Sequence, residues 1–221
     1  MRVLIFGATG MIGQGVLREC LFAPDVELVQ TVGRASTGVQ NAKLREVIQA
    51  DLFDISAYEG ELRGFDACFF CLGVASTGMT EQAYTRLTFE LTTTIALTLS
   101  RLNPAMTFVY VSGSGTDSSE KGRMMWARVK GRTENALLRM PFRAAYMFRP
   151  GFIVPLHGIQ SKTRMYRVFY ATLMPILPIL HRFFPRSILT TEELGRAMLL
   201  AARQAPARRV LETGDLRDLL S

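Results

Sequence analysis

Short apolar runs of strand length alternate, from the first residues, with a stretch of helical periodicity. Residues 2–6, RVLIF, and residues 26–32, VELVQTV, are each typical of a buried strand. In residues 11–22 the apolar positions recur on one side of a helix: Ile12, Val16, Leu17, Cys20 and Leu21. The pattern therefore predicts a strand–helix–strand unit at the start of the chain.

Three more strands are predicted by residues 44–52, 66–73 and 106–113, which read LREVIQADL, DACFFCLG and MTFVYVSG. A long helix is predicted from about Thr80, with apolar positions at helical spacing: Tyr84, Leu87, Leu91, Ile95 and Leu102. Strands that are almost continuously apolar and separated by helices indicate a parallel sheet covered on both faces. With no repeat, low-complexity segment or linker in the sequence, we expect a doubly wound α/β fold in a single domain, residues 1–221.

The last third of the chain is expected to carry substrate specificity, with residues 152–190 forming an insertion over the pocket. Its most apolar part, residues 168–180, is shorter than the roughly 20 residues that span a bilayer and contains two prolines. It is interpreted first as a helix packed on the body or over the pocket, and otherwise as a homodimer contact or, less favoured, a peripheral membrane contact. Residues 190–203 predict a helix opened by a capping box of Thr190 and Glu193.

Composition and charge narrow the class of protein. A chain of 221 residues with 48% hydrophobic content can bury one substantial core. The net charge of +7 comes from scattered arginines without a run of five basic residues, which disfavours nucleic-acid binding and suits an anionic small ligand. The first apolar run breaks at Gly7, so no leader is expected, and three cysteines are too few for a disulfide framework. We expect an intracellular, cytoplasmic protein.

Cys68 and Cys71 form a C-x-x-C pair, which could indicate redox chemistry or half of a zinc site. The surrounding run DACFFCLG has the character of a buried strand, and positions i and i+3 of a strand point to opposite faces. We therefore expect two buried thiols. His157 and His181 are the two histidines of the sequence, and no metal-ligand cluster is predicted.

The segment GATGMIG, residues 7–13, places glycines directly after the first predicted strand and at the start of a helix. Without side chains there, the backbone can approach a pyrophosphate, and the free N–H groups and dipole of the helix start bind its charge. The spacing within a strand–turn–helix unit predicts a dinucleotide site; the alternative is a tight turn without a ligand. A P-loop is excluded because no Gly-Lys-Ser/Thr follows.

The end of the second strand distinguishes the two nicotinamide cofactors. NAD-preferring folds usually supply an acidic residue there for the ribose 2′-hydroxyl. In this chain the second predicted strand is followed by Arg34, within the sequence VGR. A guanidinium suits the 2′-phosphate of NADP through charge-assisted hydrogen bonds. Arg34 therefore favours NADP, the alternative being one more exposed arginine in a loop.

Several motifs occur together in a fixed order: GATGMIG, the pair Asp51-Leu52, CLG at 71–73, VSGSG at 111–115, the region of Lys130, and FRPG at 148–151. In this order the chain resembles the atypical branch of the short-chain dehydrogenase/reductase superfamily, which includes proteins labelled NAD-dependent epimerase/dehydratase. The resemblance spans nearly the whole chain. It implies a Rossmann fold and a nicotinamide cofactor, and it leaves the reaction open because one fold hosts many functions.

The resemblance also implies which residues hold NADP. Those expected to cradle the pyrophosphate are Gly7, Thr9, Gly10, Met11, Ile12 and Gly13. Those expected at the other parts of the cofactor are Arg34 at the 2′-phosphate, Asp51 and Leu52 at the adenine, Leu72 and Gly73 at the ribose, Gly151 near the nicotinamide amide and Lys130 at the nicotinamide ribose.

Two positions depart from the pattern of working members, in which a serine polarises the substrate carbonyl and a lysine lowers the pKa of a proton-donating tyrosine. The serine position falls on Gly113, so that Ser112 or Ser114 is the candidate catalytic hydroxyl beside Lys130. Trp126 stands four residues before Lys130, where the tyrosine is expected, and an indole N–H has no useful acidity. Trp126 either packs against neighbouring structure or shapes the substrate pocket.

Two classes of function follow from these departures. The chain is either an NADP(H)-dependent oxidoreductase acting on a small carbonyl or alcohol, or a catalytically weak protein that binds NADP(H) and signals its presence to a partner.

Overall fold

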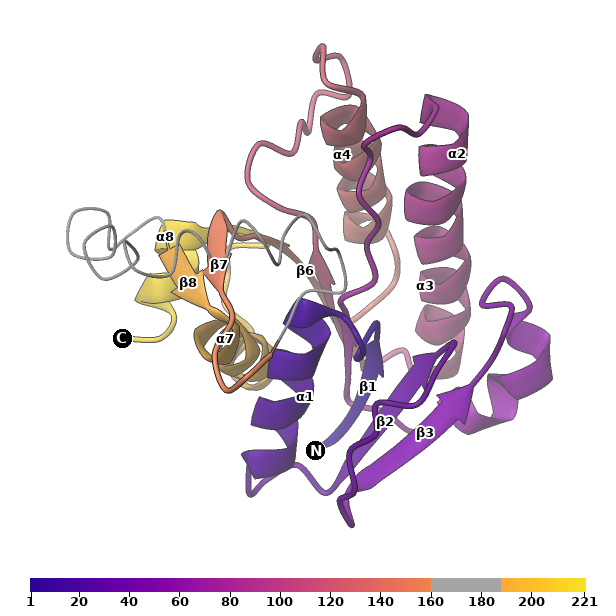
Figure 1. Ribbon diagram of the computed structural model, residues 1–221, viewed down its shortest axis with the longest axis vertical. Helices are drawn as coiled ribbons and strands as arrows, with labels where there is room; N and C mark the ends of the chain where they lie inside the picture. The colour runs from indigo at the N-terminus through magenta and orange to yellow at the C-terminus, as the bar shows by residue number, and fades with distance from the viewer. Residues whose placement is uncertain (160–187) are drawn as a thin grey trace.

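The computed structural model describes residues 1–159 and 188–221, and in this part of the chain the core is a seven-stranded sheet (Figure 1). Its order is β3-β2-β1-β4-β5-β6-β9, and every neighbouring pair is parallel. The strands are β1 (Arg2–Phe6), β2 (Leu28–Gly33), β3 (Leu44–Ile48), β4 (Ala67–Phe70), β5 (Thr107–Val111), β6 (Ala144–Arg149) and β9 (Val210–Glu212). The predicted doubly wound α/β fold is confirmed.

Helices cover both faces of this sheet, as Figure 1 shows. One face carries α1 (Met11–Phe22), α7 (Thr191–Gln204) and α8 (Thr213–Asp218). The other carries the 3₁₀ helix η1 (Ile55–Leu62), α3 (Leu91–Leu102) and α4 (Met125–Leu138). Each layer buries its own hydrophobic core against the strands, which explains why the strand sequences are apolar on both sides.

All five strands predicted from the sequence are present, and the second to fifth are shorter than expected. The third ends at Ile48 rather than 52, because the chain turns out of the sheet where the Asp51 carboxylate accepts a hydrogen bond from the Phe53 amide at 2.9 Å. The fourth ends at Phe70, although the Cys71 amide still donates to the Phe6 carbonyl at 2.9 Å.

The helix predicted from Thr80 begins there, because the Thr80 hydroxyl accepts a hydrogen bond from the Ala83 amide at 3.2 Å. It runs through α2 (Glu81–Thr85), a π-helical turn η2 (Arg86–Glu90) and then α3. The wider π turn changes the phase of the side chains, so that Thr88 is buried and Leu87 is 40% exposed. The expectation that Leu87 lies on the buried face is wrong for this reason.

A separate two-stranded sheet pairs β7 (Phe152–Val154) with β8 (Ile188–Thr190) in parallel. At the end of β8 the Thr190 hydroxyl accepts from the Glu193 amide and the Glu193 carboxylate from the Thr190 amide, which confirms the predicted capping box of α7. The apolar segment 168–180, with most of the expected insertion 152–190, lies outside the described residues. Across residues 1–159 and 188–221 there is no helix long and apolar enough to cross a membrane.

Candidate functional site

The order of the strands indicates where a ligand is expected to bind. β1 pairs with β2 on one side and with β4 on the other, so the connections that follow β1 and β4 leave the sheet in opposite directions. In open α/β sheets the crevice at the carboxyl ends of two such strands is the usual ligand site. The segment GATGMIG follows β1, and Leu72 and Gly73 follow β4, so both predicted motifs meet at this point.

Close backbone packing requires two of the three glycines in the segment after β1. Gly7 has a φ of +83°, and a Cβ atom there would lie 2.8 Å from the carbonyl carbon of Cys71 and from the amide nitrogen of Leu72. A Cβ atom on Gly13 would lie 2.1 Å from the Gly7 carbonyl oxygen. The missing side chains therefore bring the start of α1 and the loop after β4 against the same turn.

A cleft of about 300 Å³ opens beside this turn. Five residues predicted to bind the cofactor line it: Gly7, Thr9, Arg34, Leu52 and Leu72. The rest of its wall comes from the turn and from the end of β2: Ala8, Thr31, Val32, Gly33, Ala35 and Thr37. The structure thus brings together residues from four separate motifs of the sequence in one hollow.

The loop after β2 is held by Glu46 of β3, a residue that the sequence reasoning missed. Its Oε1 accepts hydrogen bonds of 2.7 Å from the amide and the hydroxyl of Thr37, and its Oε2 accepts one of 2.7 Å from the Ser36 hydroxyl. Burial opposes ionisation of Glu46, but these hydrogen bonds outweigh it and lower the pKa of the carboxyl group. The only sequence signal is that Glu46 is an acidic residue within a predicted strand.

Arg34 lies on this loop at the rim of the cleft and is exposed. Within the part of the chain that the structure describes, its guanidinium has no hydrogen bond or ion pair. Because Glu46 is occupied by Ser36 and Thr37, Arg34 keeps its charge available to a ligand anion.

The other predicted cofactor residues do not line the cleft. Gly10 caps the start of α1, and Met11, Ile12 and Gly13 form its first turn. The Asp51 carboxylate is engaged by the Phe53 amide, and Gly73 is exposed in the loop after β4. Gly151 donates its own N–H to the Thr213 hydroxyl at 2.8 Å, which fixes the chain beyond β6.

Lys130 lies on α4 beside the carboxyl end of β5, where its Nζ donates a hydrogen bond to the main-chain carbonyl of Ser112. Burial lowers the pKa of Lys130 to about 8, while the Glu134 carboxylate one turn later on the helix acts in the opposite direction. The structure therefore brings together two of the three predicted catalytic residues.

The two candidate serines differ in environment. Ser112 is buried, and its hydroxyl lies 2.5 Å from Glu134 Oε1 and 3.1 Å from the Phe148 carbonyl oxygen. Ser114 is exposed, and its amide donates to the Pro150 carbonyl at 2.9 Å. Of the two, the Ser114 hydroxyl is the accessible one.

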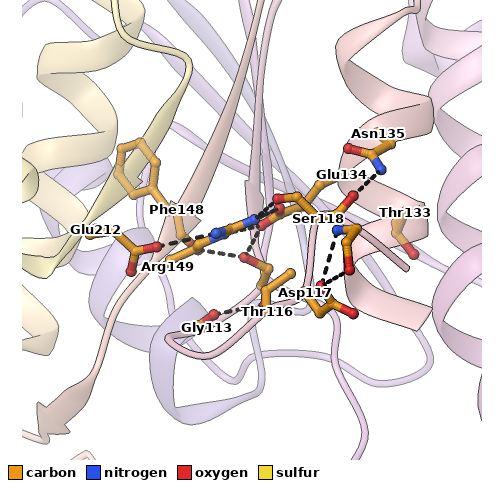
Figure 2. Close-up of polar contacts among 12 residues, drawn as sticks. Gly113, Thr116, Asp117, Ser118, Thr133, Glu134, Asn135, Phe148, Arg149 and Glu212 are labelled. Carbon is orange, nitrogen blue, oxygen red and sulfur yellow. Dashed lines mark hydrogen bonds and ion pairs between the residues drawn. The ribbon is translucent and has the colours of Figure 1, made fainter. Parts of the chain in front are cut away.

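Glu134 is the centre of a buried polar network (Figure 2). It is 1% exposed, and Arg149 of β6 binds it with Nη2 at 2.5 Å from Oε2 and Nε at 3.0 Å from Oε1. Arg149 lies between Glu134 and Glu212 in Figure 2 and also contacts the Ser118 hydroxyl at 2.5 Å. The hydrogen bonds that Arg149 donates to Glu134 raise the pKa of Arg149, so its guanidinium stays charged.

Sequence reasoning missed this ion pair. The available signals were the spacing of Glu134 four residues after Lys130 on one helix and the arginine within FRPG. Neither signal shows that the two side chains meet, because the strand carrying Arg149 comes beside α4 only through the tertiary fold.

Trp126 lies on the first turn of α4 and is partly buried. Its ring edge faces Gly115, where an added Cβ atom would lie 3.3 Å from Cη2. Gly115 has a φ of +83°, so the loop after β5 packs its bare backbone against the indole. The ring therefore supports the loop that carries Ser114.

The C-x-x-C cysteines point to opposite faces of the sheet, as expected, but the expectation of two buried thiols is wrong for Cys71, which is partly exposed. Cys68 packs in the core covered by α3, whereas Cys71, just beyond β4, packs against the core covered by α1. Burial raises the pKa of Cys68, and that of Cys71 to about 12. The described residues contain no group of three His, Cys, Asp or Glu side chains placed to hold a metal ion.

Comparison with known proteins decides the family. The family model described as NAD dependent epimerase/dehydratase family matches residues 3–122, from β1 to the loop after β5. The chain belongs to the NAD dependent epimerase/dehydratase family. The match includes the cleft residues of this epimerase/dehydratase-family protein, while Trp126, Lys130 and Glu134 lie beyond it.

The curated relatives of this epimerase/dehydratase-family protein are distant. Protein fmp52, mitochondrial, of Emericella nidulans is 27% identical over 158 residues, which are 68% of this chain and 66% of the relative. Protein HTATIP2 of Rattus norvegicus is 25% identical over 154 residues, 69% of this chain and 62% of the relative. The matches thus span slightly less than two thirds of these relatives. The cytoplasmic location expected from the sequence stays a prediction, because the relative fmp52 is named as a mitochondrial protein.

Solved structures share the fold. A UDP-N-acetylglucosamine 4-epimerase from Methanobrevibacter ruminantium has a TM-score of 0.70 at 15% identity, covering 96% of this chain and 75% of that one. A short-chain dehydrogenase/reductase from Burkholderia thailandensis has a TM-score of 0.68 at 18% identity, covering 97% and 92%. At these identities the likeness shows the Rossmann-type architecture of the epimerase/dehydratase-family chain and no substrate.

Proposed function

We propose that the protein is an NADP(H)-dependent oxidoreductase that acts on a small carbonyl or alcohol. The observation that carries this proposal is Arg34, which lies at the rim of the cleft without a partner among the described residues while the nearby acid, Glu46, is occupied. An unpaired guanidinium and a saturated carboxylate favour a 2′-phosphate over a 2′-hydroxyl.

The residues present fit the cofactor. The bare backbone at Gly7 and the N–H groups at the start of α1 suit a pyrophosphate, and the apolar Leu52 and Leu72 suit the adenosine half. Lys130 Nζ suits hydroxyls of the nicotinamide ribose, because its ammonium has three protons and Ser112 accepts one of them. When bound, the reduced cofactor supplies a hydride; the protein binds, orients and excludes water.

In this function Ser114 is the hydroxyl that orients the substrate carbonyl. It is exposed at the carboxyl end of β5, whereas the Ser112 hydroxyl is buried against Glu134. Trp126 supports the loop of Ser114 and supplies no proton. The proton for the substrate oxygen must then come from another group, while cofactor binding is expected to be intact.

A second candidate function is that of an NADP(H)-sensing protein without turnover. The observation that favours it is Trp126, since a binding protein needs no acid at that position. In place of a small-molecule substrate, the protein would then have a partner that recognises the NADP(H)-bound state, such as a second copy of the chain. Carbonyl-dependent oxidation of NADPH distinguishes the two functions.

Calorimetric titration with NADPH and NADH tests the proposal. We expect the wild type to prefer NADPH, and Arg34→Ala to lose affinity for NADPH by roughly tenfold to a hundredfold, as expected for one charged phosphate contact. Arg45→Ala, a second exposed arginine outside the cleft, is the matched control and should keep the wild-type affinity. Equal affinities of the wild type for the two nucleotides would refute the assignment.

A further inference from the structure

The site needs a proton donor that the helix turn before Lys130 does not supply. Trp126 stands at that turn, and its indole N–H does not release a proton near neutral pH. The nearby tyrosines of the described residues are engaged elsewhere. Tyr84 and Tyr110 are 1% exposed and hydrogen-bonded to the side chains of Thr88 and Thr133, and burial raises the pKa of both phenols.

Lys130 lies against the loop that carries Ser114. Its Nζ is held at the end of β5 by the Ser112 carbonyl, and it approaches within 3.9 Å of the position that a Cβ of Gly113 would take. Gly113 comes directly before Ser114, the exposed hydroxyl. The ammonium thus lies against the short stretch, at the carboxyl end of β5, that carries the candidate carbonyl-orienting group.

We propose that Lys130 is the catalytic acid of this site and delivers to the substrate oxygen the proton that a tyrosine delivers in related enzymes. The proposal rests on the NADP(H)-dependent reduction proposed above and adds the residue that completes it. Trp126 then has no acid function, and the lysine that follows one turn later on α4 supplies the proton.

The step balances in atoms and electrons. The hydride and its two electrons pass from the reduced nicotinamide to the carbonyl carbon, which is reduced while the cofactor is oxidised. One N–H bond of the Lys130 ammonium breaks, and an O–H bond forms on the former carbonyl oxygen. The products are the alcohol and a neutral lysine amine, which regains a proton from water.

The surroundings of Lys130 suit release of a proton. Burial lowers the pKa of Lys130 to about 8, near the range in which a general acid is most effective, whereas an exposed lysine holds its proton far more tightly. The negative charge of Glu134 opposes this lowering of the pKa and favours the ammonium form of Lys130. Hydrogen bonds from Ser112 and Arg149 hold the Glu134 carboxylate in place. Glu134 is accordingly a positioning residue.

Other ionisable groups come from the elements packed around α4. The charged groups are Glu81 of α2, Arg132 of α4, Arg149 of β6 and Asp117 of the preceding loop. Glu81 is paired with Arg128, Arg132 lies over the Phe89 ring of η2, Arg149 binds Glu134, and Asp117 accepts a hydrogen bond from the Gly122 amide. The other two ionisable groups are the phenols of Tyr84 of α2 and Tyr110 of β5. The charged members of this set are engaged by partners other than Lys130, so Glu134 is the charge that chiefly opposes the effect of burial.

The pH dependence has a defined sign. Reduction needs the ammonium, so its kcat at saturating NADPH should fall as pH rises through about 8. Oxidation of the alcohol needs the neutral amine, so its kcat should rise through the same range. A fall in kcat for reduction and a rise in kcat for oxidation at the same pH indicate a single group that donates the proton in one direction and accepts it in the other.

The test combines Lys130→Arg with a direct titration of the side chain. Arginine keeps the positive charge and the donors but does not release a proton, so we expect NADPH affinity within a few-fold of wild type and a fall in kcat of roughly 10²- to 10⁴-fold. The sequence has four lysines, Lys43, Lys121, Lys130 and Lys162, so NMR of protein with ¹³C-labelled lysine gives few signals. The Lys130 signal is identified by its loss in the variant and should titrate near pH 8.

Lys121→Arg, at an exposed loop position, is the matched control and should leave kcat and NADPH affinity unchanged. A Lys130→Arg variant with wild-type kcat, or a Lys130 signal that titrates above about pH 10, overturns the inference. Failure of the wild type to bind NADPH overturns the proposed function instead. NADPH binding without oxidation by any carbonyl favours the sensing protein and overturns the acid role of Lys130.

Discussion

Lys130 Nζ donates a hydrogen bond to the main-chain carbonyl of Ser112, which joins the helix carrying Trp126 to the end of β5. The hydroxyl of the same serine meets Glu134, one turn further along α4, so Ser112 binds the helix at two successive turns. This double link places the ammonium relative to the loop of Ser114. It also gives Ser112 a structural task that differs from carbonyl orientation.

The two serines should therefore respond differently to substitution. Ser114→Ala is expected to lower kcat for carbonyl reduction and to leave NADPH affinity unchanged, because it removes an exposed hydroxyl. Ser112→Ala is expected to lower the free energy of unfolding by about 1 kcal/mol, the usual value of one hydrogen bond, measured by urea denaturation. The reverse result, loss of turnover in Ser112→Ala alone, would identify Ser112 as the orienting group.

The ion pair of Glu134 and Arg149 should be a large contributor to stability. Glu134→Gln leaves a guanidinium without its main partner at a site where the two side chains are 11% and 1% exposed. Breaking a buried pair of this kind costs about 3 to 5 kcal/mol in unfolding free energy. Glu212→Gln removes the other carboxylate on Arg149, which is 49% exposed, and should cost less than about 1 kcal/mol. Similar losses in both variants would contradict a dominant role of Glu134.

The cysteines at 68 and 71 should be inert in the folded protein. The Cys68 thiol is buried in the core on one face of the sheet, Cys71 is partly buried against the core on the other face, and burial raises the pKa of each. The reaction of these two thiols with a disulfide reagent should be slow in the folded protein and should go to completion when denaturant unfolds it. Stoichiometric zinc in the purified protein would contradict the opposite-face arrangement.

Trp126 should be dispensable for cofactor binding. Trp126→Ala removes a ring that contacts the Gly115 loop and not the cleft, so NADPH affinity should stay nearly unchanged. Trp126→Tyr introduces a phenol one turn before Lys130 and should raise turnover of a reactive diketone or quinone, with Trp126→Phe as the ring-only control. Equal turnover of the tyrosine and phenylalanine variants would show that the phenol does not reach the substrate.

The sequence predicts the elements that local pattern determines. The strand–helix–strand unit with GATGMIG, the start of a helix at Thr80 and the Thr190–Glu193 capping box follow from apolar periodicity, glycine spacing and side-chain caps, and the structure has each of them. The exposure of Leu87 could not be predicted in this way, because apolar periodicity assumes a regular α-helix and gives no sign of the π-helical turn, which packs against α4.

The same limit applies to the site. Arg34, Leu52 and Leu72 converge because the Rossmann topology brings the ends of neighbouring strands together, which a motif can indicate. The engagement of Glu46 by Ser36 and Thr37, and of Glu134 by Arg149, depends on side chains from strands distant in sequence. No local pattern encodes those pairs, so they appear only in the folded structure.

The most direct measurement of the central claim is a crystal structure of the protein with NADPH. We expect the 2′-phosphate within hydrogen-bonding distance of the Arg34 guanidinium, the pyrophosphate over the turn from Gly7 to Gly13, and Lys130 Nζ on the nicotinamide ribose. The Ser112 hydroxyl should remain on Glu134, with Ser114 facing the nicotinamide. A nucleotide bound outside this cleft, or one whose 2′-phosphate points into solvent away from Arg34, would contradict the account.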